Sequence, residues 1–289
     1  MRSLIRTLCA SLTASVMVAT ALPSLAATSS SPTPKATQVP AGLVGNDISW
    51  PNCPVGLGVP GRRSSNEPMP HADARFVIIG LTNGRAFTRN PCIAKHVKYV
   101  KDKGLKAAAY TMLSYPNRAE RAAYGRKGPY DARTYVNRIA NVGYAQTAYA
   151  LQTHRAAGLN SPIVWVDVEP RAERPWSARD ARNQALITGA LRAIADARLS
   201  AGIYTYAVAW RDLVGNWTVP AAPLWAPSHT RSTKYRAKKA DAIKSCGRTS
   251  FTGGPLVITQ WVHHRRDYDV TCPAITTSAV TYFRDYSKK

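Results

Sequence analysis

The sequence predicts a single α/β domain built around a parallel β-sheet. Seven short apolar runs, rich in β-branched and aromatic residues, have the composition of strands buried on both faces: 43–49, 76–81, 106–112, 163–168, 201–206, 223–226 and 256–262. Helices are expected within 93–103, 132–157 and 178–199, where Gly104, Gly158 and Gly202 mark the ends. Strand and helix alternate along the chain, so the sheet is either closed as a barrel or open and doubly wound. No G-x-G-x-x-G motif follows the first strand, which disfavours a dinucleotide site.

The first 42 residues predict two segments that precede this domain. In residues 1–26, Arg2 and Arg6 lie before an apolar run, and Ser24 and Ala26 have the spacing of a cleavage site. This pattern indicates a secretory signal peptide rather than a membrane anchor. Residues 27–42 are rich in Ser, Thr and Pro, which predicts a flexible linker. The folded domain is expected over 43–289, in a protein that is extracellular or associated with a cell wall and has no transmembrane segment after cleavage.

The cysteines agree with export. Cys9 lies in the predicted signal peptide, and four cysteines remain in the rest of the chain. An even number in a secreted protein predicts two disulfides. We expect the pairs Cys53–Cys92 and Cys246–Cys272, because each closes a local loop. A zinc site is disfavoured, since no C-x-x-C spacing occurs.

The charge balance is strongly basic. The chain has 39 Lys and Arg against 16 Asp and Glu, a formal net charge of +23. Such a field attracts polyanions, and those open to a secreted protein are anionic cell-wall polymers, membrane surfaces and extracellular nucleic acid. No nucleic-acid reader motif is present, so no specific nucleic-acid partner is expected. A solvated basic surface without a partner is the alternative. The densest basic run, 231–240, predicts an exposed loop.

Two acids at the end of one predicted strand are the strongest chemical signal. Asp167 and Glu169 close the run 163–168 and precede Pro170. Alternate strand residues share a face, so the two carboxyl groups are expected about 7 Å apart. That separation suits two carboxyls that act on one glycosidic bond. The alternative is that they cap the next helix or bind Arg171 and Arg174.

Further acids are expected beside this pair. Asp47 and Asp269 fall near the ends of predicted strands, which suggests an acidic pocket within a basic protein. His263 and His264 lie close to carboxylates, but adjacent strand residues point to opposite faces, so no metal site is expected. No G-x-S-x-G motif supports a serine nucleophile, and paired cysteines would not act as one.

Several short motifs follow one another in a recognisable order. They are Gly45-Asn46-Asp47-Ile48-Ser49, Asp167-Val168-Glu169, Ile203-Tyr204-Thr205, Leu224-Trp225-Ala226 and Gln260-Trp261, with Asp269 near the end. In this order the sequence resembles the family 25 glycoside hydrolases, which are secreted muramidases of bacteria and phages, and related glycoside-hydrolase-like domains. The resemblance runs from about Gly45 to Asp269.

The resemblance implies a TIM-like (β/α) barrel that lacks some of the usual helices and uses neither a metal nor an organic cofactor. It implies that Glu169 is the general acid. Asp167 would stabilise positive charge or orient the N-acetyl group of the substrate as an internal nucleophile. Asp47 and Asp269 would line the same cleft. The implied reaction is cleavage of the β-1,4 bond after N-acetylmuramic acid in peptidoglycan, with retention of configuration.

Aromatic rings near the strand ends are candidates for stacking on sugars: Trp50, Tyr110, Tyr204, Trp225 and Trp261. Core packing is their alternative role. Where the family has K-A-T-E-G, this sequence has Gly80-Leu81-Thr82-Asn83-Gly84. The second hypothesis for the protein is therefore a non-catalytic module that binds cell-wall glycan on the same fold.

Overall fold

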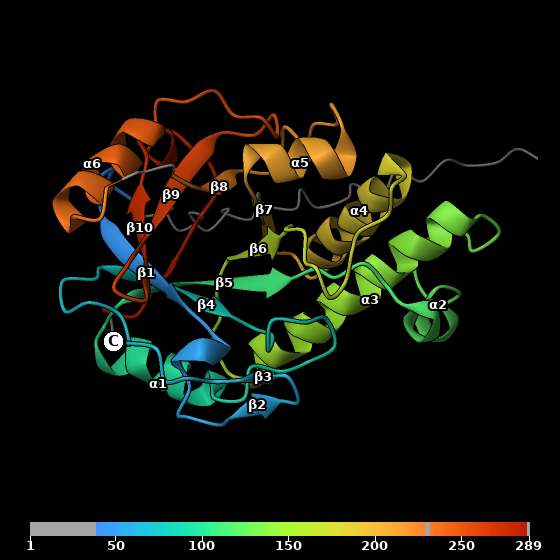
Figure 1. The fold of residues 1–289 in the computed structure, drawn as a ribbon, viewed down its shortest axis with the longest axis horizontal. Coiled ribbons are helices and arrows are strands. Elements are labelled where there is room, and N and C mark those ends of the chain that lie inside the picture. Colours follow the sequence, from blue (N-terminus) through green and yellow to red (C-terminus); the bar gives the residue numbers. More distant parts are fainter. Residues whose placement is uncertain (1–38, 229–231, 288–289) are drawn as a thin grey trace, which may run out of the picture. The chain divides into compact units, whose positions relative to one another are not determined.

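Eight strands form a closed barrel in the computed structural model, which describes residues 39–228 and 232–287 (Figure 1). The strands are β1 (Val44–Ile48), β4 (Phe76–Gly80), β5 (Lys106–Met112), β6 (Ile163–Asp167), β7 (Ser200–Tyr204), β8 (Leu224–Pro227), β9 (Leu256–His263) and β10 (Arg266–Thr271). Their order is β5-β4-β1-β10-β9-β8-β7-β6, and β6 pairs with β5 to close the ring. The barrel is thus confirmed and the open sheet excluded. The predicted signal peptide and most of the predicted linker lie outside the described residues.

One strand runs against the expected direction. β10 is antiparallel to both β9 and β1, whereas the other neighbouring pairs in the ring are parallel. Only His264 and Arg265 connect β9 to β10, and both have positive φ, 47° and 59°. A two-residue turn of this kind joins antiparallel strands, because a parallel connection needs a long crossover. The short strand β11 (Arg284–Asp285) pairs with β5 outside the ring.

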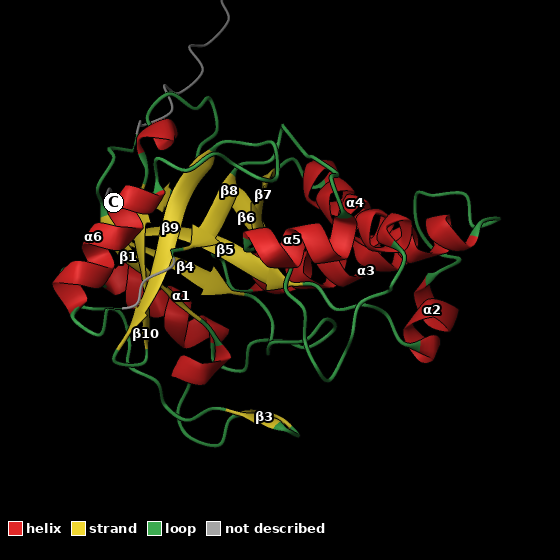
Figure 2. Cartoon of the chain, turned by 45° about the horizontal axis from the view of Figure 1, so that its top comes forward, coloured by secondary structure: helices red, strands yellow, loops and turns green. Residues whose placement is uncertain are grey.

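Helices occupy the connections between most parallel strands and lie on the outer side of the barrel (Figure 2). They are α1 (Ile93–Asp102), α2 (Arg118–Tyr124), α3 (Tyr135–Ala156), α4 (Asp180–Asp196), α5 (Ala207–Val214) and α6 (Tyr235–Ser245). The connection from β1 to β4 contains no α-helix. It has a 3-10 turn, Trp50–Asn52, and a small hairpin of β2 (Gly58–Val59) and β3 (Arg62–Arg63). The barrel therefore lacks some of the usual helices, as the resemblance implied.

The helix α6 corrects the prediction of an exposed loop over 231–240. Its sequence, YRAKKADAIKS, consists mostly of good helix formers, but it buries only Ala242 and Ser245. Ala242 packs against Trp261, Tyr268 and Val270 of the β9–β10 hairpin. A helix with so narrow an apolar stripe has no clear periodic signal in the sequence, which explains the error.

Large aromatic rings inside the barrel pack over glycines of the neighbouring strand. A Cβ at Gly202 of β7 would lie 2.3 Å from the ring of Trp165 on β6, and a Cβ at Gly45 would lie 2.6 Å from the ring of Phe76. Trp165 also packs against Trp225 and Tyr282. The glycines provide the space that these rings fill. The interior of the barrel, away from the ends of the parallel strands, is therefore a packed core rather than a channel.

Strand residues that point outward pack against the helices. Val77 and Val166 lie in one buried cluster with Val97 of α1 and Ile187 of α4. The alternation of inward and outward side chains is what brings the polar residues of the strand ends to one place.

The described part of the chain includes no helix that is long and apolar enough to cross a membrane.

Both predicted disulfides are present. Cys53–Cys92 joins the β1–β4 connection to the start of α1, and Cys246–Cys272 joins the end of α6 to the end of β10. The two bonds close loops with sequence separations of 39 and 26 residues.

Replacing either pair with serines is expected to lower the free energy of unfolding by about 3–4 kcal/mol. The reason is that each bond restricts the unfolded chain, and the longer loop gives the larger effect. Urea unfolding of the two double variants, each beside the oxidised wild-type protein, measures the loss. Equal stability of the oxidised and reduced wild-type protein would contradict this expectation.

Candidate active site

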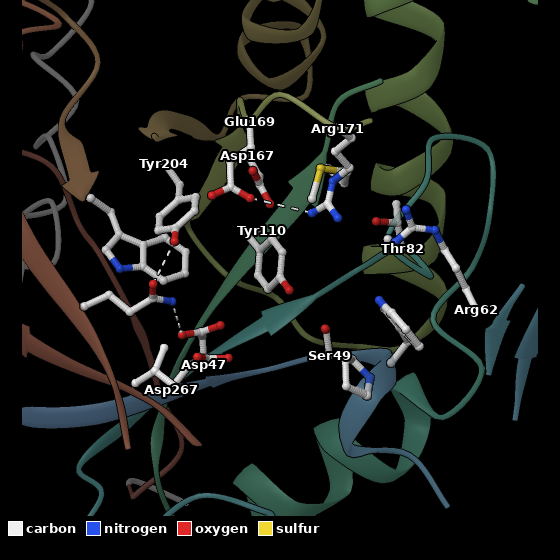
Figure 3. A pocket seen from close by; sticks show the side chains of 17 residues that line it. Asp47, Ser49, Arg62, Thr82, Tyr110, Asp167, Glu169, Arg171, Tyr204 and Asp267 are labelled. Atoms are coloured by element: carbon white, nitrogen blue, oxygen red, sulfur yellow. Dashed lines mark hydrogen bonds and ion pairs between the residues drawn. The ribbon is translucent and has the colours of Figure 1, made fainter. Parts of the chain in front are cut away.

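A pocket of about 340 Å³ lies where the parallel strands end (Figure 3). Its walls include the last residues of three strands: Met112 of β5, Asp167 of β6 and Tyr204 of β7. Parallel strands of a barrel end at the same rim, so residues distant in the sequence meet there. The acids that line the pocket are Asp47, Asp167, Glu169 and Asp267.

The predicted pair comes from β6 and the residues that follow it. Asp167 is 4% exposed, and its Oδ1 has no hydrogen-bond partner among the described residues. The side chain of Glu169 is 25% exposed, and a guanidinium nitrogen of Arg171 lies 3.6 Å from its carboxylate. The indole nitrogen of Trp176 donates a 2.9 Å hydrogen bond to the main-chain oxygen of Glu169, which holds this segment against the pocket.

Burial governs the protonation of both carboxyls. It raises the pKa of Asp167 well above its ordinary value, and the negative charge of Glu169 raises it further. Burial also raises the pKa of Glu169, while the charge of Arg171 acts in the opposite direction. A carboxyl with a raised pKa that remains reachable from the pocket is suited to donate a proton.

Asp47 lies across the pocket from this pair, in a chain of hydrogen bonds. The hydroxyl of Tyr204 donates to Oε1 of Gln260 at 2.7 Å, and Nε2 of Gln260 donates to Oδ1 of Asp47 at 2.7 Å. Burial raises the pKa of Asp47 well above its ordinary value, and the charges of Asp267 and Asp269 add to the effect. Asp47 is thus held in place by polar contacts from β7 and β9.

The structure corrects the expected position of Asp269. This residue lies within β10 rather than beyond a strand end, it is fully buried below the pocket, and the indole of Trp225 donates a 2.8 Å hydrogen bond to it. The acid at the rim is Asp267, which the sequence analysis missed and which pairs with Asp47 across β1 and β10. Recognition of the alternating strand over 266–271 would have revealed it.

Four of the five predicted aromatic residues line the pocket: Trp50, Tyr110, Tyr204 and Trp225. Tyr204 and Trp225 are almost fully buried and form its floor, so they combine the core and the pocket roles. Trp261 does not line the pocket. Because its neighbour Gln260 points into the barrel, Trp261 points outward and stacks on Tyr268, which corrects its expected position.

Outside the pocket, three potential metal ligands lie close together in the described chain. Cys53, Cys92 and His96 bring their ligand atoms within 4.8 Å of one another. The two sulfurs are joined in a disulfide, so neither is available as a thiolate ligand. The pocket itself presents carboxyl, hydroxyl and guanidinium groups.

The buried acids predict a pH-dependent stability. Burial raises the pKa of Asp267 to about 6, with the charges of Glu67 and Glu169 acting in the same direction, against an ordinary value of 3.8. The native state therefore binds this proton more tightly than the unfolded chain does. The stability that Asp267 contributes is fully present below pH 3.8 and is lost as the pH rises through 6.

Asp267→Asn is accordingly expected to raise the free energy of unfolding by up to about 3 kcal/mol at pH 7.5 and by much less at pH 4. Urea unfolding at the two pH values measures the difference. Asp73→Asn, which changes a carboxyl whose side chain is 84% exposed, is the matched control. A gain that is the same at both pH values would mean that the buried charge is not its cause.

A family model described as "Lysozyme-like protein 1" matches residues 117–241. No curated protein matches the chain.

Solved structures of lysozymes have the same fold. A bacterial lysozyme from Streptomyces coelicolor is 14% identical with a TM-score of 0.51, over 83% of this chain and 98% of that chain. A family 25 lysozyme from Aspergillus fumigatus is 15% identical with a TM-score of 0.50, over 82% and 99%. A muramidase from Acremonium alcalophilum is 15% identical with a TM-score of 0.50, over 79% and 93%. The resemblance found in the sequence is confirmed for the fold: the barrel has the fold of the family 25 lysozymes, and residues 117–241 match a lysozyme-like family model.

Proposed function

We propose that this protein is a secreted glycoside hydrolase that cleaves β-1,4 bonds of peptidoglycan or a related amino-sugar polymer. The observation that carries the proposal is the pair Asp167 and Glu169 at the end of β6, in the pocket at the rim of the barrel. The lysozyme-like fold supports the same class of reaction. The predicted signal peptide and the two disulfides support secretion.

In the proposed reaction Glu169 is the general acid. Its carboxyl is partly exposed, so a glycosidic oxygen can reach it, and its raised pKa favours the protonated form that donates to this oxygen. When the proton leaves, Glu169 becomes a carboxylate, and Arg171 at 3.6 Å stabilises that charge.

Asp167 would act on the sugar rather than on the leaving group. It lies deeper in the pocket than Glu169, on the same face of the chain. Its negative charge would stabilise positive charge that develops on the sugar ring, or it would orient the N-acetyl group of the substrate as an internal nucleophile. Asp47 and Asp267 line the opposite side of the pocket, where they would contact the same sugar.

The partners that this proposal implies are peptidoglycan or another cell-wall glycan. Trp50 and Tyr110 are the less buried aromatic residues of the pocket and offer ring faces for stacking on a sugar. The net charge of +23 would hold the protein on anionic wall polymers.

A non-catalytic binding module on this fold is the second candidate. The observation that favours it is the ion pair between Arg171 and Glu169, because a neighbouring guanidinium favours the ionised carboxyl and so opposes proton donation. In that case the pocket would bind a sugar without cleaving it.

Release of reducing ends from purified peptidoglycan distinguishes the two candidates. The protein without residues 1–26 is incubated with the polymer, and the soluble products are analysed by mass spectrometry, beside a heat-inactivated sample. Products with a new reducing end would identify hydrolysis and the bond that is cut. Sedimentation of the protein with the polymer without any released sugar would support the binding module instead.

A further inference from the structure

The arginines of the pocket lie away from Asp47 and Asp267. Figure 3 shows Asp47 and Asp267 on one side and the guanidinium groups of Arg62 and Arg171 on the other. Asp167 and Glu169 also lie across the pocket from Asp47, with Glu169 beside Arg171. A sugar in this pocket would therefore meet Asp47 and Asp267 at one edge and the two arginines at the other.

Two arginines line this part of the pocket, and a third lies near Arg62 outside the lining. Arg62 belongs to β3 of the small hairpin, Arg85 follows β4, and Arg171 follows β6. We call these three residues the arginine cluster. The charges of Arg171 and Arg85 both lower the pKa of Arg62, in addition to the larger effect of burial. The like charges are thus close enough to repel one another.

The local structure is shaped around Arg62. Its side chain is only 11% exposed, and it forms an ion pair with Glu173. Gly84 has a φ of +66°, and a Cβ there would lie 2.7 Å from Nη1 of Arg62. A glycine at this position therefore leaves room for the guanidinium against the pocket wall.

The arginine cluster is not fully paired by the protein. Glu173 pairs with Arg62 and Glu169 lies near Arg171, but no ion pair is found for Arg85 among the described residues. The Nε atoms of Arg62, Arg85 and Arg171 are buried without hydrogen-bond partners. The three guanidinium groups exceed the two nearby carboxylates by one positive charge, which an additional anion in the pocket would balance.

We propose that the arginine cluster binds an anionic substituent of the glycan, a carboxylate or a phosphate, next to the bond at Glu169. This inference rests on the proposed function and names its substrate class: an acidic glycan rather than a neutral one. Guanidinium groups match both anions with two parallel hydrogen bonds. The acids on the opposite side would exclude a substrate with its charge in the reverse orientation.

Binding of short glycans tests this assignment without requiring turnover. The probes are a disaccharide of N-acetylglucosamine and N-acetylmuramic acid with a free carboxylate, the same disaccharide with that carboxylate amidated, and an N-acetylglucosamine disaccharide phosphate with its unphosphorylated counterpart. Affinities are measured by calorimetric titration. We expect the acidic member of at least one pair to bind 10–100 times more tightly than its neutral counterpart, as charge-assisted hydrogen bonds provide. The pair that shows the difference identifies the anion as carboxylate or phosphate.

Variants assign the preference to the arginine cluster. Arg62→Gln is expected to reduce the preference for the acidic probe at least fivefold and to leave the affinity for the neutral probe within twofold. Arg85→Gln removes a charge outside the pocket lining and is expected to reduce the preference by a smaller factor, about twofold. Arg62→Lys should retain part of the preference, because it keeps the charge. Arg236→Gln, on the exposed surface of α6, is the matched control and should retain all of it.

Equal affinity of the wild-type protein for acidic and neutral probes would overturn the inference, as would a variant that loses both affinities equally. Arg85→Gln provides the answer if Arg62→Gln fails to fold. The outcome is separate from that of the proposed function. A preference for acidic probes without hydrolysis of peptidoglycan would refute the reaction and leave the anion site standing, whereas hydrolysis without any preference would do the reverse.

Discussion

Glu169→Gln is expected to lower kcat on peptidoglycan by about 10²–10⁴-fold, because the amide cannot donate the proton that the leaving oxygen needs. Gln retains the size and much of the polarity of Glu, so substrate affinity should change little. The loss should therefore appear in kcat rather than in KM. Initial rates of reducing-end release over a range of peptidoglycan concentrations measure the two parameters.

The control for this prediction is Asp102→Asn, which changes an exposed carboxyl at the end of α1, outside the pocket. It should retain wild-type activity. Circular dichroism and thermal unfolding of both variants show whether the fold is kept, and sedimentation with peptidoglycan shows whether binding is kept. Wild-type turnover by Glu169→Gln would remove Glu169 from the role of general acid.

Trp165→Ala is expected to lower the free energy of unfolding by about 3–5 kcal/mol. Trp165 is fully buried inside the barrel, with ring centroids 6.0 Å from Trp225 and 6.3 Å from Tyr282. Gly202 lies directly against the indole ring of Trp165. Because it has no side chain, it cannot fill the space that the indole leaves. A cavity would therefore remain, and its cost adds to the lost burial.

Urea unfolding measured by circular dichroism tests this prediction. Val208→Ala on α5, where the valine is 50% exposed, is the control and should change the free energy of unfolding by no more than about 0.5 kcal/mol. A loss below about 1 kcal/mol for Trp165→Ala would mean that the barrel collapses into the space. Activity of the same variant would show how far the pocket depends on this core, since Trp225 contacts Trp165 and also lines the pocket.

The sequence alone determined the barrel strands other than β10, both disulfides and the convergence of Asp167 and Glu169. Each of these follows from local information. Runs of buried residues identify the strands, the period of two places Asp167 and Glu169 on one face, and short loops favour the observed cysteine pairs. The same period of two places Trp261 outside the barrel once the side chain of its neighbour Gln260 is known to point inward.

The tertiary structure alone decided the pairing of Asp47 with Asp267 at the rim and the meeting of Arg62 with Arg171. These features depend on which segments become neighbours when the ring closes. Asp47 meets Asp267 because β1 pairs with β10, and Arg62 meets Arg171 because a hairpin after β1 lies against the loop after β6. Such contacts join residues more than 100 positions apart, and no local preference of the chain encodes them. Closure of the barrel brings the strand ends to a single rim, and the position of each side chain there is set by strand pairing rather than by its own sequence neighbourhood.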